Sequence, residues 1–133
     1  MPVTVERIPN KPVIILHYSG LLDVDTVKSA FAQSLVLAAQ IEGTIYRIAD
    51  VSAANGSFQE VMGIIKAVRD GLPGNPLDAR IRVVFVGNHQ LVQYYTNAVK
   101  NMGAAPMPVF HSLEDALQYV ELEQQKHLQG ESK

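Results

Sequence analysis

The sequence predicts a single α/β domain with one mixed sheet of five strands flanked by four helices. Apolar runs recur along the 133 residues at near-regular intervals, and segments with helical periodicity fill the gaps between them. Alternation of this kind produces parallel strands joined by right-handed crossovers. Only a short turn separates the first two runs, so the N-terminal strand is expected to be antiparallel. The predicted order is β-β-α-β-α-β-α-β-α.

Five segments are predicted to be strands. Val3 to Ile8 alternates apolar and polar residues, as a half-buried edge strand does. The unbroken apolar run from Val13 to Tyr18 is typical of a strand that is covered on both faces. The other three predicted strands are Thr44 to Ala49, Ile81 to Val86 and Met107 to Phe110. A loop is expected from Val51 to Gly56.

Four segments carry apolar residues three and four positions apart, which is the spacing of one helix face. Asp23 or Asp25 can cap the first helix, and Gly43 is expected to end it in a left-handed conformation. Ser57 and Glu60 have the spacing of a capping box at the start of the second. The residues expected to face the core are Val24, Val27, Phe31, Leu35 and Ala38, then Phe58, Val61, Ile65, Val68 and Leu72, then Leu91, Val92, Tyr95, Val99 and Met102, and finally Leu113, Ala116, Leu117 and Val120. Residues 1–127 are expected to form the domain, and residues 128–133 a frayed tail.

Composition excludes several classes of function. The formal net charge is −2 and no run of Lys or Arg occurs, so we expect no nucleic-acid partner. The absence of cysteine excludes disulfides, thiol catalysis and thiolate metal sites, and it suits a reducing cytoplasm. We see no signal peptide and no apolar stretch approaching the roughly 18 residues that cross a bilayer, so we expect no membrane insertion.

Three strings carry a resemblance to a known family: IADVSAANGSFQEV, RVVFVGNHQLVQYY and MPVFHSLEDAL. Together with the order of elements, they resemble the STAS domain, the fold of anti-sigma-factor antagonists and sulphate-transporter tails. The resemblance covers nearly the whole chain. It is closer to the uncharacterised "SpoIIAA-like" group than to the regulatory antagonists.

The resemblance makes Ser57 a candidate phosphorylation site. Regulatory members of the family have an Asp-Ser pair followed closely by Gly at the second helix. Here the matching stretch is Asn55-Gly56-Ser57-Phe58, so the Asp is absent and the Gly precedes the Ser. A helix cap is the structural alternative, because the Ser57 hydroxyl can accept a hydrogen bond from an unpaired amide.

Polar residues follow four of the predicted strands, and the carboxyl ends of parallel strands share one edge of a sheet. The candidate ligand or partner residues at this edge are His17, Asp50, Ser52, Asn88, His89 and His111. They could hold a metal or transfer protons, but turns and helix caps recruit the same residue types. No HExxH, phosphate-loop or GxSxG pattern occurs, so we predict no metal, no cofactor and no catalytic residue.

Three further residues stand out from the apolar patterns. Arg47 lies inside a predicted strand, so it needs either an open sheet face or a partner; we expect an open face, with an anion contact as the alternative. Val36 and Leu37 lie off the apolar stripe of the first helix. These two side chains either pack against neighbouring loops or form a surface for a partner. Because the net charge is too small to keep such surfaces apart, we predict a homodimer.

These observations favour a non-enzymatic, cytoplasmic STAS-like module with regulatory or protein-interaction function. It would bind a protein partner, itself or a regulatory protein, through its second helix and the loops at the strand ends. A carrier of a small apolar ligand is the alternative, and an enzyme using the strand-end His and Asp residues is the third hypothesis. An apolar pocket would favour the carrier. Convergence of His17, Asp50, His89 and His111 would favour the enzyme.

Overall fold

The computed structural model describes residues 3–87 and 90–131, with side chains as far as Lys126. Its elements follow the predicted order: β1 (Val3–Arg7), β2 (Val13–Leu21), α1 (Val24–Ala38), β3 (Ile45–Asn55), α2 (Phe58–Arg69), β4 (Ile81–Val86), α3 (Gln90–Asn101), β5 (Val109–Phe110) and α4 (Leu113–Glu131). Strand neighbours follow chain order, β1-β2-β3-β4-β5. β1 is antiparallel to β2 and every other pair is parallel, so the predicted fold class is confirmed.

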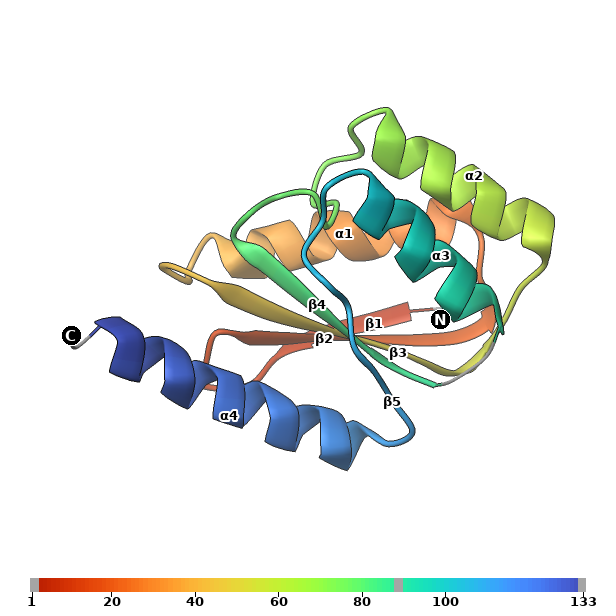
Figure 1. The fold of residues 1–133 in the computed structure, drawn as a ribbon. Helices are drawn as coiled ribbons and strands as arrows, with labels where there is room; N and C mark the ends of the chain where they lie inside the picture. The colour runs from red at the N-terminus through yellow and green to blue at the C-terminus, as the bar shows by residue number, and fades with distance from the viewer. Residues whose placement is uncertain (1–2, 88–89, 132–133) are drawn as a thin grey trace.

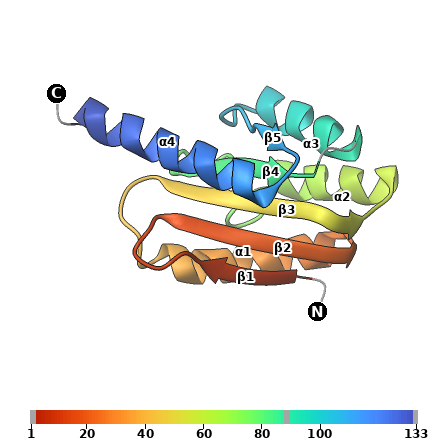
Figure 2. The same cartoon turned by 90° about the horizontal axis from the view of Figure 1, so that it is seen from below.

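The helices divide unequally between the two faces of the sheet. α1, α2 and α3 lie on one face and α4 lies on the other (Figure 1). Side chains alternate along β2 accordingly: Ile14 and Leu16 belong to the core beneath the three helices, and Val13 and Ile15 to the smaller core beneath α4. α4 crosses its face of the sheet over β3, β4 and β5. On that same face, α4 leaves β1 and the adjoining part of β2 uncovered (Figure 2).

The strands in the middle of the sheet are longer than predicted. β3 continues to Asn55, so the expected loop from Val51 to Gly56 is wrong for most of its length. The reason is tertiary: β2 also extends, to Leu21, and its backbone pairs with residues 53–55 of β3. Between the pairs His17–Asp50 and Ser19–Ala53 the register shifts, which places one extra residue on β3 as a β-bulge does.

Two helices turn a predicted core residue outward. Leu35 of α1 and Phe58 of α2 are exposed, although their spacing placed them on the apolar faces. α1 also ends before Gly43, since its C-terminal cap is Ala39 in a right-handed conformation. At the N-termini the expected caps are present: Asp23 Oδ1 accepts from Thr26 N at 2.8 Å, and Ser57 Oγ accepts from Glu60 N at 3.2 Å. α4 continues to Glu131, through much of the predicted tail.

Within the described residues, no helix has both the length and the apolar character that crossing a bilayer requires.

Gly87 is required where the end of β4 passes over the bulge of β3. Its φ is 107°, and an added Cβ would lie 3.0 Å from the backbone nitrogen of Ser52. We predict that Gly87→Ala lowers the free energy of unfolding by about 2 kcal/mol or more, through strain and this close approach. Gly103→Ala is the matched control, since Gly103 has a φ of 110° and nothing within 4 Å of an added Cβ. Equal losses in urea denaturation would show that the approach to Ser52 is unimportant.

Candidate functional site

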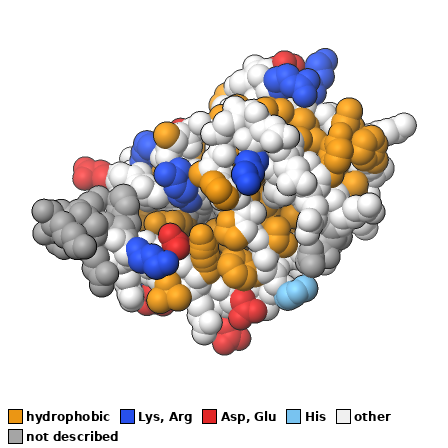
Figure 3. All heavy atoms as spheres, in the orientation of Figure 1, with side chains coloured by type: hydrophobic (Ala, Val, Ile, Leu, Met, Phe, Trp, Pro, Cys, Tyr) orange, Lys and Arg blue, Asp and Glu red, His pale blue; other side chains and the backbone are white. Residues whose placement is uncertain are grey.

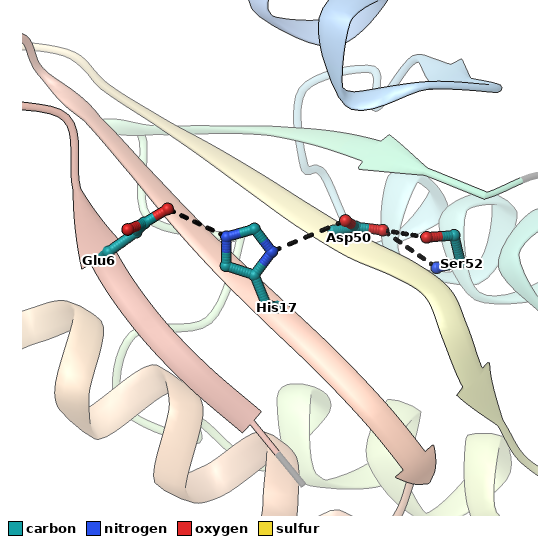
Figure 4. Close-up of polar contacts among 4 residues, drawn as sticks. All are labelled: Glu6, His17, Asp50 and Ser52. Carbon is teal, nitrogen blue, oxygen red and sulfur yellow. Dashed lines mark hydrogen bonds and ion pairs between the residues drawn. The ribbon is translucent and has the colours of Figure 1, made fainter. Parts of the chain in front are cut away.

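Four polar side chains form a continuous row on the α4 side of the sheet, in the part that α4 does not cover (Figure 4). We call this row, Glu6, His17, Asp50 and Ser52, the polar strip. Glu6 Oε1 lies 3.1 Å from His17 Nε2, and Asp50 Oδ2 lies 3.7 Å from His17 Nδ1. Ser52 donates from Oγ to Asp50 Oδ1 at 2.6 Å and from its backbone nitrogen at 3.1 Å. Three of the six predicted edge residues are therefore brought together.

Strand register explains the polar strip. His17 follows Val13 and Ile15 on the α4 side of β2, and it is directly paired with Asp50 of β3. The bulge then lets Ser52 fold back onto Asp50, in the manner of an Asx turn. Glu6 comes from β1, opposite Ile15 and diagonal to His17, within the reach of a long side chain. Glu6 is the member that the sequence did not single out.

The geometry of the polar strip does not match hydrolytic or metal chemistry. The Ser52 hydroxyl donates to Asp50, whereas a nucleophilic serine needs a hydrogen bond to the histidine base. The two carboxylates flank opposite nitrogens of the His17 ring, so the three groups do not converge on one point. Among the described residues, no group of three His, Cys, Asp or Glu could hold a metal ion.

Of the other three predicted edge residues, the structure describes only His111. Asn88 and His89 lie outside the described residues. His111 is exposed and follows β5, whereas His17 is on β2. Three strand spacings, roughly 14 Å, separate these two positions. The structure therefore does not bring His17 and His111 within reach of a shared ligand atom.

An exposed apolar surface adjoins Ser57 at the start of α2. Phe58, Met62 and Tyr94 are 52%, 45% and 39% exposed, and we call them the α2–α3 surface. The rings of Phe58 and Tyr94 are 4.9 Å apart between centroids, and the Tyr94 hydroxyl donates to Met62 Sδ at 3.2 Å. Hydrophobic atoms gather around the start of α2 in Figure 3. Sequence analysis missed this surface because helical spacing placed Phe58 in the core.

The two residues proposed for a dimer surface differ in their environment. Val36 is 70% exposed on α1. Leu37 packs against the larger core, so it is not free for a partner to the same extent. Val36 is the member of the pair that remains available on the surface.

Arg47 is not on an open sheet face, and that expectation is wrong. It is 2% exposed and points to the side covered by α1, α2 and α3, where it lines a cavity of about 60 Å³. Nη1 donates to the carbonyl of Gly74 and, at 3.5 Å, to Ser34 Oγ. The guanidinium carbon lies 4.3 Å from the centre of the Phe31 ring.

Two tyrosines share the cavity with Arg47. Burial raises the pKa of Tyr18 well above its usual value, an effect that the positive charge of Arg47 partly offsets. Burial likewise raises the pKa of Tyr95 from 10.0 to about 12, again opposed by Arg47. Desolvation lowers the pKa of Arg47 itself. The charge of Arg47 therefore interacts electrostatically with the hydroxyl groups of both tyrosines.

Comparison with solved structures places the fold. An uncharacterized protein of the DUF3478 family with a SpoIIAA-like fold, from Shewanella loihica PV-4, is 18% identical with a TM-score of 0.56, and the alignment covers 88% of this chain and 90% of that one. The anti-sigma factor antagonist SpoIIAA in its unphosphorylated form is 14% identical with a TM-score of 0.55, over 90% and 97% of the two chains. The chain thus has a STAS-like, SpoIIAA-like fold. No family model and no curated protein matches its sequence.

Tyr95 makes stability depend on alkaline pH. In the unfolded chain its hydroxyl ionises near pH 10.0, whereas the folded protein keeps the proton until about pH 12. Between these values the unfolded state binds fewer protons, so stability falls as pH rises. We expect Tyr95→Phe to reduce this loss by about 1 kcal/mol per pH unit above pH 10, and to leave the slope below pH 10 unchanged. Urea midpoints from pH 8 to 11.5 measure both slopes, and the same slope above pH 10 in both proteins would contradict the assignment.

Proposed function

We propose that this chain is a non-enzymatic, cytoplasmic regulatory module that binds a protein partner through the α2–α3 surface. The observation that carries this proposal is the contact among three large, exposed apolar side chains, Phe58, Met62 and Tyr94. Aromatic residues and Met are enriched in protein interfaces, and aromatic side chains are frequent among the residues that dominate binding energy. Water contact with such a cluster is unfavourable, and a partner that covers it gains the corresponding free energy.

The fold likeness supports the same kind of function. One solved neighbour is an anti-sigma factor antagonist, a protein whose target is another protein. The structure of that neighbour is of its unphosphorylated form. We therefore consider phosphorylation of Ser57, the residue that caps α2. Ser57 is exposed and directly precedes Phe58, so a phosphate added there would border the α2–α3 surface.

The competing enzyme hypothesis has less support. The polar strip joins His17 to Asp50, but Ser52 is hydrogen-bonded to the carboxylate. His111 follows β5, three strands away from β2. A ligand carrier has a specific observation in its favour, which is the cavity beside Arg47.

Phe58→Ser tests the protein-binding proposal. Phe58 is half exposed, so the variant should fold, yet it should weaken capture of the partner about 30-fold, as loss of an aromatic interface anchor does. Tagged protein in extract of the source cells, followed by quantitative mass spectrometry, measures the loss.

Val36→Ser is the matched control, because it removes an exposed apolar side chain from α1. It should retain the captured partner. If Val36→Ser reduces capture of the partner as strongly as Phe58→Ser does, the choice of surface is wrong.

Light scattering of the Val36→Ser variant also tests the homodimer that we propose for α1. The wild-type protein should have twice the mass of the chain, and the variant should have a lower mass.

Two substitutions at Ser57 distinguish its role as a helix cap from a role as a regulatory phosphorylation site. Ser57→Ala removes the acceptor for the Glu60 amide and should cost about 1 kcal/mol in urea denaturation. Ser57→Asp should keep wild-type stability, since Asp caps as well as Ser and suits the helix dipole. If phosphorylation regulates the surface, Ser57→Asp loses the partner that wild type captures. Identical partners for both proteins would leave Ser57 as a cap alone.

A further inference from the structure

The cavity beside Arg47 has an apolar wall and a charged end. It lies between the sheet and the three helices α1, α2 and α3, and most of its lining is aliphatic or aromatic. Along β3 its wall runs from Arg47 to Ala54, seven residue steps or roughly 20 Å. Arg47, at one end of this run, is buried, whereas Ala54, Asn55 and Leu91 at the other are partly or fully exposed. The cavity therefore has a buried charge at one end, and residues that reach solvent border the other.

Arg47 lacks the partners that a buried guanidinium requires. Its Nε has no hydrogen-bond partner among the described residues. No ion pair found in the described part of the chain includes Arg47; the four such pairs involve Lys11, His17 twice, and Lys126. The guanidinium contacts the Phe31 ring, the Gly74 carbonyl and Ser34 Oγ. Asp78 acts on the guanidinium electrostatically but forms no ion pair with it. An unpaired buried charge costs several kcal/mol, and Arg stays protonated even when desolvated.

We propose that the cavity binds a short, unbranched aliphatic carboxylate, with its head group against Arg47 and its chain along β3 towards Ala54. The carboxylate supplies the missing anion to the guanidinium, and Arg is the side chain whose donors match a carboxylate. Tyr18 and Tyr95, which also line the cavity, are hydroxyl donors at the same end. The apolar wall accepts the chain.

The size of the cavity sets the length of the chain. A free volume of about 60 Å³ is several times what a single water needs, and less than half of the roughly 150 Å³ of an engineered cavity that binds benzene. A few methylenes fill it, and a longer chain extends through the Ala54 end. Hexanoate is therefore the probe, acetate lacks the chain, and hexan-1-ol lacks the charge. Phe58, Met62 and Tyr94 are not among the residues that line the cavity, so either proposal can fail without the other.

Calorimetric titration of the purified full chain tests the proposal. We expect hexanoate to bind and acetate to bind far more weakly, because each buried methylene contributes about fourfold in affinity. Hexan-1-ol should bind at least tenfold more weakly than hexanoate, as expected for loss of a hydrogen bond to a charged group. No binding of hexanoate at millimolar concentration, or equal affinity for the acid and the alcohol, overturns the proposal.

Variants then locate the site. Arg47→Met keeps the length of the side chain and should weaken hexanoate at least tenfold while leaving hexan-1-ol unchanged. Ala54→Leu, which narrows the cavity without touching Arg47, should weaken both, whereas Ala53→Leu, its exposed neighbour outside the lining, should weaken neither. If Arg47→Met does not fold, the Ala54 and Ala53 variants decide the outcome. Equal effects of these two variants place the ligand elsewhere and overturn the proposal.

Discussion

β3 lies in the middle of the sheet with hydrogen-bonded neighbours on both edges. Over its first five residues, 45–49, helices also bury both of its faces. Ile48 is buried beneath α4, and Ala49 is buried beneath the three helices of the opposite face. The pairing of β3 with β2 and β4, and the docking of helices on both sides, depend on one another.

Unequal coverage of the two faces produces the polar strip and the cavity. A single helix cannot cover five strands, so the face that carries α4 keeps an open area, and the polar strip occupies it. Three helices cover the other face, and their curved surfaces do not fill all the space above β3. That space is the cavity, and Arg47 is enclosed in it because the strand alternation points its side chain to the crowded side.

The start of α2 is where these features meet. Asn55 and Gly56 line the cavity, Ser57 caps the helix, and Phe58 begins the α2–α3 surface. A ligand in the cavity and a protein on the surface would therefore act on the same short segment of chain. The chain shares its fold with SpoIIAA, and at 14% and 18% identity the likeness is one of fold.

The sequence by itself determined the order of elements, the parallel pairing, and the Asp23 and Ser57 caps, because helical and strand periodicity and capping chemistry are local. It also indicated that His17, Asp50 and Ser52 lie together, but it placed them at the sheet edge, whereas β2 and β3 continue past His17 and Asp50. Only the tertiary structure decided the rest. β3 extends past Asp50 because β2 offers it a partner backbone, and Phe58 is half exposed where its ring meets Tyr94 of α3. Arg47 is buried because the helices close over it, and periodicity along one strand cannot predict which face of a sheet receives three helices and which receives one.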